Sequence, residues 1–420
     1  MDELLASVYE IEAPNNGRIF AVHRNLKDVV TIMGSVRGGW ELLPRNKEDV
    51  AVLCVSLLDT GTKTRSKEAL RNEIAERGAT LRFSSSSTRT YFTATCLPND
   101  VPFILERITD RLQNTVFTQK ELDISRTNII SRIKNTDSDT GTQAEIALSR
   151  MLYDHSHPNY SDTNAERLMN LAAVTLKDVQ EFQKNLGQSG LIIALVGDID
   201  PKKAASAALK SFSTLRVGTT SRPTIHTNTK VQKAQTARIV IPEKAAIDVR
   251  MGISLPIRYG DSDFFPMVLC ASLLGGSFSS YLMDTLRERD GLTYHIQASL
   301  AGTSIQKDGY FIIDTSFAPA LYERGVAATL LETKKFLAKG LTAKALEMKK
   351  NELVGRYVMS MSTTYGLATR LTTVAEREQP ISEIAAYNRY IRAVTHKDLL
   401  RAAKRISVDS LSIASAGTFE

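Results

Sequence analysis

The histidines are the first residues to consider for chemistry, because imidazole rings bind metal ions and act as acids or bases near neutral pH. The chain has 420 residues and six histidines. His155 and His157 are two residues apart and follow Asp154, so both rings could contact one metal ion. A coordinating set needs three or more ligands on a rigid frame, and Pro158-Asn159-Tyr160 indicates a surface turn. We therefore expect no functional metal site at these histidines.

The other histidines and the cysteines form no catalytic pattern. No Ser/His/Asp set has a supporting motif around the remaining histidines, which are His23, His226, His295 and His396. The cysteines are odd in number, form no C-x-x-C and stand among apolar residues. They are therefore predicted to be buried free thiols: Cys54, Cys96 and Cys270.

One apolar stretch occurs twice in the chain. Val52–Leu58 reads V-L-C-V-S-L-L, and Val268–Leu274, 216 residues later, reads V-L-C-A-S-L-L. A second repeat, A-V-T-x-K-D, occurs at residues 173–178 and 393–398. The order and the spacing of these matches indicate two copies of one domain, because a solenoid would need three or more shorter units.

The composition agrees with two globular domains. Apolar residues make up 43% of the chain and charged residues 24%, which are ordinary values for folded proteins. Around Pro223 the sequence becomes rich in Thr, Ser, Lys and Gln, as is typical of a linker. We predict an N-terminal domain at 1–215, a linker at 216–236 and a C-terminal domain at 237–420.

Strands and helices are both predicted within each copy. Alternating or β-branched runs at 18–24, 29–36 and 247–255 indicate strands, and the apolar segment 48–58 is interpreted as a buried helix. Thr118 followed by Glu121 is a helix start of the capping-box type. Each copy is expected to place helices over one face of its sheet, so the fold class is α+β.

The charge and the hydropathy pattern argue against two function classes. The net charge of +7 is small for this length and is spread without a dense basic block, so nucleic-acid binding is not expected. No apolar run approaches the roughly 20 residues of a membrane span. No signal peptide is visible, which favours the cytoplasm, or the periplasm if the N-terminus has been trimmed.

A long motif in the second copy resembles a known family. Residues 274–282 read L-G-G-S-F-S-S-Y-L and residues 286–294 read L-R-E-R-D-G-L-T-Y. This pattern is similar to that of the pitrilysin/insulinase family of zinc metallopeptidases, especially its short bacterial and mitochondrial-processing-peptidase-like members. The resemblance extends to Val36–Gly39, Gly61-Thr62 and the duplication. It implies two homologous domains, each a mainly antiparallel sheet covered by helices, arranged as two halves of a clamshell.

The chain departs from the family at the zinc site. Active members carry H-x-x-E-H on a helix just before the G-T pair, where two histidines bind zinc and the glutamate activates the bound water. In register with Gly61-Thr62, this chain has Val52, Val55 and Ser56 at the ligand and base positions. The family's distal glutamate should fall between Ile124 and Asn135, a segment without glutamate. We therefore predict no zinc site and no metal or other cofactor in this chain.

The resemblance assigns roles to an arginine and a tyrosine. In the family, the Arg and Tyr of R-E-x-x-G-L-x-Y face the zinc domain and contact the substrate backbone; here they are Arg287 and Tyr294. A hydroxyl or guanidinium directed at the scissile carbonyl would stabilise the charge that develops on its oxygen. Gly275 and Gly276 are predicted to let the substrate backbone approach closely, although a helix-ending turn explains them equally well.

These expectations combine into one functional hypothesis and one alternative. The chain is expected to be the non-catalytic subunit of a heterodimeric zinc peptidase, with the zinc on a homologous H-x-x-E-H-bearing partner and a peptide or unfolded protein as substrate. The alternative is a catalytically inactive protein of the same fold that binds peptides or acts in assembly. Retention of Arg287 and Tyr294 favours the first hypothesis.

Overall fold

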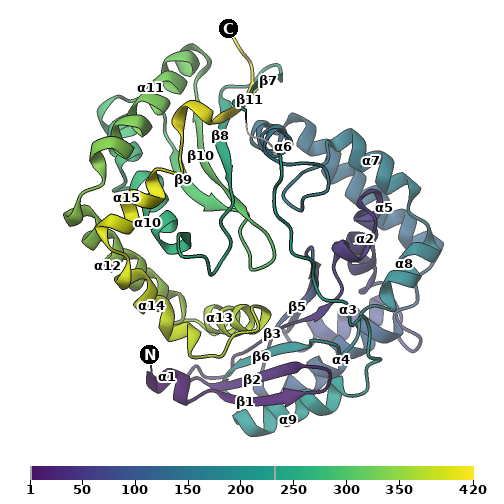
Figure 1. The fold of residues 1–420 in the computed structure, drawn as a ribbon. Coiled ribbons are helices and arrows are strands. Elements are labelled where there is room, and N and C mark those ends of the chain that lie inside the picture. Colours follow the sequence, from purple (N-terminus) through teal and green to yellow (C-terminus); the bar gives the residue numbers. More distant parts are fainter. Residues whose placement is uncertain (1, 231–232) are drawn as a thin grey trace. The chain divides into compact units, whose positions relative to one another are not determined.

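The computed structural model describes residues 2–230 and 233–420. They form two compact units, each built on one β-sheet (Figure 1). Unit 1 consists of residues 1–131, 167–223 and 356–387, and unit 2 of residues 132–166, 224–355 and 388–420. The α+β class predicted from the sequence is confirmed. The division falls within helices α5, α7, α12 and α14, whose bounds are given below.

The sheet of unit 1 has the strand order β1-β2-β6-β3-β5-β4. Only the pairing of β2 with β6 is parallel among the pairings described for this sheet, so the sheet is mainly antiparallel as predicted. Its strands are β1 (Tyr9–Ala13), β2 (Gly17–His23), β3 (Val30–Arg37), β4 (Thr80–Ser85), β5 (Arg89–Cys96) and β6 (Ile192–Gly197).

The sheet of unit 2 repeats this topology. Its order is β7-β11-β8-β10-β9, and here the pairing of β7 with β11 is the parallel one. Its strands are β7 (Thr236–Val240), β8 (Ile247–Leu255), β9 (Ile296–Ala301), β10 (Gly309–Phe317) and β11 (Ser412–Gly417). Taken in chain order, these five correspond to β2, β3, β4, β5 and β6. The order and direction of pairing agree throughout, as expected for a duplicated domain.

The helices of the first half of the chain precede residue 223. They are α1 (Asp2–Ala6), α2 (Asp49–Leu57), α3 (Lys67–Ala75), α4 (Val101–Asn114), α5 (Gln119–Asn135), α6 (Thr140–Leu152), α7 (Asn164–Ala173), α8 (Leu176–Gln183) and α9 (Pro201–Phe212). The helices of the second half are α10 (Phe264–Gly275), the π-helical η5 (Met283–Arg289), α11 (Tyr322–Lys335), the π-helical η7 (Phe336–Gly340), α12 (Ala343–Ser360), α13 (Thr364–Glu376), α14 (Glu383–Ala393) and α15 (His396–Ala403). The 3-10 helices are η1 (Trp40–Leu42), η2 (Arg45–Lys47), η3 (Pro98–Asp100), η4 (Thr136–Ser138), η6 (Pro319–Leu321) and η8 (Val408–Ser410).

The repeated apolar stretches lie on corresponding helices. Residues 52–57 belong to α2, which follows β3, and residues 268–274 belong to α10, which follows β8. Leu53, Cys54, Leu269 and Cys270 are all fully buried. The interpretation of these stretches as buried helices is confirmed.

Each sheet is covered in part by a helix from the other half of the chain. Helix α13 packs on β3 and β6 (Figure 1). Leu367 and Leu371 of this helix lie in one buried cluster with Phe20 and Ile192. Helix α6 packs on β8 and β11, where Leu148 is buried against Ala414. The predicted boundaries at 215 and 237 follow the sequence repeat. In the compact units, however, residues 356–387 with α13 belong to unit 1, and residues 132–166 with α6 belong to unit 2.

The expectation of helices over a single face of the sheet is wrong for the central strand of unit 1. Ile192, Ala194 and Val196 contact α13 and its neighbours, while Ile193 and Leu195, which point the other way, are also fully buried. A strand buried on both faces reads as a continuous apolar run. Helices α9 and α4, which pack against β6 and β5, lie in this unit as well.

Candidate functional site

The loop between α10 and β9 carries the motif that the sequence singled out. Helix α10 ends at Gly275, and Gly276 caps it with φ −88° and ψ 0°. A Cβ atom on Gly275 would lie 2.3 Å from the backbone nitrogen of Ala298 in β9. Close packing of a helix on a strand therefore accounts for Gly275 without reference to substrate. The substrate-binding role of Gly275 and Gly276 stays a prediction.

Arg287 and Tyr294, the two residues to which the motif gives a role, lie side by side. The Cζ atom of Arg287 is 4.6 Å from the ring centroid of Tyr294 and 5.3 Å from that of Phe278. Tyr294 is 82% exposed and Phe278 79% exposed, so both rings face solvent. Exposed cation–π contacts of this kind contribute about 0.5–1 kcal/mol each. They hold the guanidinium between two rings without consuming its hydrogen-bonding groups.

This arginine–tyrosine surface, defined as Phe278, Arg287 and Tyr294, offers several hydrogen-bond donors. Arg287 makes one ion pair, Nε to Glu288 Oε1 at 3.3 Å, and Glu288 is itself largely exposed. Within residues 2–230 and 233–420 the Tyr294 hydroxyl makes no hydrogen bond. A guanidinium and a phenolic hydroxyl together can donate to a carbonyl oxygen or to a negatively charged group.

A buried carboxylate supports the helix that carries Arg287. Glu332 on α11 is 4% exposed and accepts hydrogen bonds from Tyr281 Oη (2.7 Å), Lys335 Nζ (2.9 Å) and Arg289 Nη2 (3.4 Å). Burial by itself would raise the pKa of Glu332, but the hydrogen bonds from Lys335 and Tyr281 and the positive charges of Lys335 and Arg289 together outweigh burial, so the net shift is downward. Burial and the bond to Glu332 raise the pKa of Tyr281 to about 12. The motif's helix is thus tied to α11.

A buried lysine supports the loop that carries Phe278. Lys349 on α12 is 5% exposed and donates to Ser277 Oγ at 2.9 Å and to Glu352 Oε2 at 2.6 Å. Sequence reasoning missed Glu332, Lys349 and Phe278 as parts of the site. Phe278 stands inside the recognised motif, and its aromatic side chain was the available signal. Glu332 lies 51 positions from its partner Tyr281, and Lys349 lies 72 positions from its partner Ser277. No local sequence pattern links residues so far apart.

The two histidine positions and the base position of the H-x-x-E-H motif all lie on α2. Val55 is buried, Val52 is half-buried and Ser56 is exposed. The Ser56 hydroxyl donates to the carbonyl oxygen of Leu53 at 2.7 Å. Two aliphatic side chains cannot coordinate zinc, and a neutral hydroxyl is not among the usual zinc ligands. In the described ranges, 2–230 and 233–420, no group of three or more His, Cys, Asp or Glu side chains could hold a metal ion.

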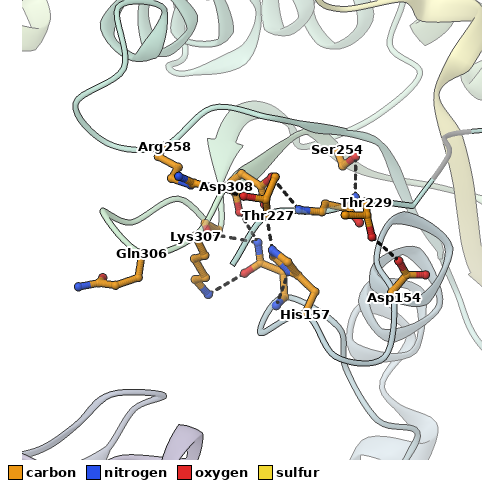
Figure 2. A network of polar contacts seen from close by, with 12 residues as sticks. Asp154, His157, Thr227, Thr229, Ser254, Arg258, Gln306, Lys307 and Asp308 are labelled. Carbon is orange, nitrogen blue, oxygen red and sulfur yellow. Dashed lines mark hydrogen bonds and ion pairs between the residues drawn. The ribbon is translucent and has the colours of Figure 1, made fainter. Parts of the chain in front are cut away.

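The turn predicted at Pro158-Asn159-Tyr160 is present, with the N–H of Tyr160 donating to the carbonyl oxygen of His157 at 2.9 Å, but His157 itself is buried. His157 is 4% exposed, its ring stacks on that of Tyr153 at 4.3 Å, and its Nε2 lies 2.9 Å from Asp308 Oδ1 (Figure 2). The backbone N–H of Asn159 donates to Nδ1 at 3.1 Å, so Nε2 carries the proton that Asp308 accepts. His155 is exposed. Both nitrogens of His157 are therefore engaged, and the two histidines form no metal-binding pair.

Part of the predicted linker is fixed within unit 2 by the same polar network. The backbone N–H of Asn228 donates to Asp308 Oδ2 at 2.9 Å, and its side-chain amide donates to Leu152 O at 2.8 Å. Lys230 Nζ donates to Arg150 O at 2.7 Å. Figure 2 shows Asp308, Thr227 and Thr229 in this network. Residues 227–230 are thus held by part-buried and exposed polar contacts that the polar composition of the segment did not reveal.

The prediction of buried free thiols is confirmed. All three cysteines are buried and unpaired. Burial raises the pKa of Cys96 and of Cys270 to about 12 and raises that of Cys54 further. A thiol with so high a pKa is a poor nucleophile at neutral pH.

Two family models match the chain. Residues 20–162 match the model described as insulinase (peptidase family M16), and residues 173–353 match the model described as peptidase M16 inactive domain. Together they span most of both copies of the repeat. In the described part of the chain no helix is long and apolar enough to cross a membrane.

Relatives and solved structures agree with these matches. A "non-peptidase homolog YmxG" of Helicobacter pylori is 23% identical over 80% of this chain and 76% of its own length. A mitochondrial-processing peptidase subunit beta of Lentinula edodes is 22% identical over 86% of this chain and 79% of its own length. The crystal structure of a peptidase M16 inactive domain from Pseudomonas fluorescens matches with a TM-score of 0.87 at 20% identity, covering 98% of both chains. That structural likeness concerns the fold.

Proposed function

The chain belongs to the insulinase (peptidase M16) family, and we propose that it is the non-catalytic subunit of a two-chain zinc peptidase. In this proposal the zinc and its H-x-x-E-H motif belong to a homologous partner. This chain supplies Arg287 and Tyr294, which position the peptide and stabilise the tetrahedral intermediate. Similarity to a mitochondrial-processing peptidase subunit supports a two-chain arrangement.

The observation that carries the proposal is the contrast between the two motifs of the chain. Val52, Val55 and Ser56 offer no zinc ligand and no general base. Arg287 and Tyr294, in contrast, are retained together, with the guanidinium 4.6 Å from the exposed ring. A large exposed ring is costly in contact with water. Its retention beside an arginine therefore supports a binding role for the pair.

The proposed mechanism divides the work between the two chains. The metal on the partner would supply the activated water that attacks the scissile carbonyl. Arg287 would pin a backbone carbonyl of the peptide, which keeps the strand in register. The Tyr294 hydroxyl would donate to the oxygen that gains negative charge, and so would act mainly in the transition state.

The test is steady-state kinetics of the chain mixed with an H-x-x-E-H-bearing partner. Tyr294→Phe removes one exposed hydroxyl, so we expect kcat to fall on the order of 10²-fold. Arg287→Ala should raise KM as well, because Arg287 would also grip the ground-state peptide. Two variants serve as controls. Tyr365→Phe changes a tyrosine that is 59% exposed in unit 1. Arg238→Ala changes an arginine held over Tyr322 at 5.2 Å.

Both site variants should assemble with the partner as the unchanged chain does, which size-exclusion chromatography would check. Full peptidase activity of both variants in an intact complex would overturn the proposed roles.

A second candidate function is a peptide-binding or assembly protein without any peptidase role. The observation in its favour is that similar proteins bear the descriptions "non-peptidase homolog" and "probable inactive metalloprotease". In that case the chain would bind an extended peptide along a sheet edge without cleavage. Peptide binding by the isolated chain, together with no gain of activity with any H-x-x-E-H-bearing partner, would favour this function.

A further inference from the structure

Three strands of unit 1 carry an arginine at the same end of the sheet. Arg18 is the first residue of β2 that pairs with β6, and its partner there is Ile192. Arg37 ends β3 and is the direct partner of Arg89, the first residue of β5. Like charges placed directly opposite each other on antiparallel strands destabilise a sheet. This end of the sheet therefore carries an electrostatic cost that the fold must offset.

The second copy of the domain builds the same sheet end without arginines. The pairing of β7 with β11 begins at Thr236, and the last pair between β8 and β10 is Leu255 with Gly309. The strand order and pairing directions are otherwise the same in the two units. The three arginines are thus not needed to form this topology, and their clustering requires another reason.

The arginines line a cavity of about 420 Å³, which we call the arginine pocket. This volume lies within the range of small-molecule sites. The end of α13 and the residues after it cover the pocket. Its charged lining residues are Arg18, Arg37, Arg89, Arg222, Glu376 and Glu378.

Arg89 is a buried charge that no carboxylate in the described ranges contacts by a hydrogen bond. It is 8% exposed and donates through Nε to Ser35 Oγ (2.7 Å) and through Nη2 to the carbonyl oxygens of Ser35 and Gly190. The nearest carboxylate oxygen, on Glu376, is 3.9 Å from Nε. Burial lowers the pKa of Arg89 and raises that of Glu376. A buried cation with so little compensation is costly unless an anion joins it.

The other three arginines use some of their guanidinium donors within the fold and leave the rest for the pocket. Arg37 is held over Gly190, where a Cβ atom would lie 2.6 Å from its Nε, and its Nη2 is 3.4 Å from Glu378 Oε1. Arg18 pairs through Nε with Glu10 at 2.8 Å and donates through Nη1 to the carbonyl oxygen of Gln379 at 2.6 Å. Arg222 makes no hydrogen bond or ion pair with any residue in 2–230 or 233–420. Counting Glu10 with the two lining carboxylates, the four arginines leave one positive charge in excess.

We propose that the arginine pocket binds a small organic anion through a carboxylate or phosphate group. Guanidinium groups match both groups in shape and bind them through paired hydrogen bonds. The volume leaves room for a body larger than the anionic group itself. The pocket shares no residue with the arginine–tyrosine surface, so this proposal does not depend on the proposed function.

The experiment is isothermal titration of the full chain with citrate and, separately, with inorganic phosphate, at constant ionic strength maintained with sodium chloride. We expect saturable binding at one site for at least one probe. Arg37→Gln and Arg222→Gln should each weaken that binding on the order of 10-fold or more. Arg238→Gln is the matched control, because Arg238 is an exposed, ion-paired arginine of unit 2 and should leave binding unchanged.

The two probes distinguish the sources of the anion. Binding of citrate alone assigns the pocket to carboxylates, and binding of phosphate alone assigns it to phosphates. Arg89→Gln is avoided as the main test because loss of its buried hydrogen bonds could unfold the chain. The proposal is overturned if neither probe binds in the millimolar range, or if Arg37→Gln and Arg222→Gln, with unchanged thermal stability, bind as the wild type does.

Discussion

At the scale of single residues, the buried cysteines differ from the arginine and tyrosine of the motif in how accessible their reactive groups are. Cys54, in the segment that aligns with the family's zinc motif, is completely buried. Tyr294 is exposed, and Arg287 beside it is half-buried, with its Nε in an ion pair with Glu288. Burial favours the neutral thiol, whereas the exposed phenol and the partly exposed guanidinium keep donors that can bind a ligand.

The first residue-scale prediction concerns thiol reactivity. Burial raises the pKa of all three cysteines, so they should react slowly with an aromatic disulfide reagent that releases a yellow thiolate. At pH 7.5 we expect very slow labelling of the native chain and labelling of three thiols after unfolding. Ser56→Cys provides the control, since residue 56 is exposed on α2 and its thiol should react quickly. Fast labelling of two or more thiols in the native wild type would contradict the burial of these residues.

The second residue-scale prediction concerns acid stability. A hydrogen bond from Lys47 Nζ (2.7 Å), with further bonds from Thr175, lowers the pKa of Asp178 to about 2. A carboxyl with a depressed folded-state pKa stabilises the fold above its unfolded pKa, near 4, and loses this contribution as the pH falls towards 2. Asp178→Asn should therefore lower stability at pH 7 by about 1 kcal/mol and flatten the pH dependence between about 4 and 2.

Chemical denaturation over a series of pH values measures this effect. Asp409→Asn is the control, because the Asp409 side chain is 80% exposed and, among the described residues, pairs only with an exposed lysine, Lys334. Its substitution should change stability little at any pH. Equal pH profiles for wild type and Asp178→Asn would show that the Lys47 contact does not persist in solution.

At the scale of elements, the second copy depends on one close contact between a helix and a strand. Gly275 at the end of α10 lies against β9, and the residues of the arginine–tyrosine surface follow within the next twenty positions. Helix α10 thus sets where the loop with Phe278 begins. The buried contacts of Glu332 and Lys349 then hold the loop and η5 in place.

The element-scale prediction compares two glycines. Gly275→Ala would place a methyl group 2.3 Å from the Ala298 nitrogen, so we expect a loss of about 1–3 kcal/mol in unfolding free energy. Gly355→Ala is the control, because Gly355 is exposed in α12 and, apart from its chain neighbours and its own helix backbone, no described atom lies within 4 Å of the position that its methyl group would take. That change should stabilise the helix by about 0.5–1 kcal/mol. Thermal unfolding of both variants would test this; equal changes of the same sign would contradict the packing of α10 on β9.

At the scale of the whole molecule, the two copies share a sheet topology but differ in the residues they present. Unit 1 carries the degenerate zinc positions and the arginine pocket, and unit 2 carries the arginine–tyrosine surface. The two copies therefore share the buried strands and helices, and they differ in the polar and aromatic residues that could bind a ligand. Such a difference is compatible with the proposal that another subunit carries the metal.

The whole-molecule prediction is that the purified chain contains far less than stoichiometric zinc and cleaves no peptide by itself. The reason is the replacement of the ligand and base positions by Val52, Val55 and Ser56. Elemental analysis and a peptide-cleavage assay measure the two quantities, with an H-x-x-E-H-bearing relative purified in parallel as the positive control. About one zinc per chain, removable with loss of cleavage activity, would refute the prediction.

The sequence by itself determined the family, the duplication, and the buried helices at 52–58 and 268–274. These features depend on short-range patterns: apolar spacing, caps and a continuous motif. Only the tertiary structure decided that α6 and α13 cover sheets from the other half of the chain, because an apolar helix face does not specify which sheet it meets. For the same reason only the fold revealed the His157–Asp308 pair and the arginine pocket, which join residues from distant segments of the chain.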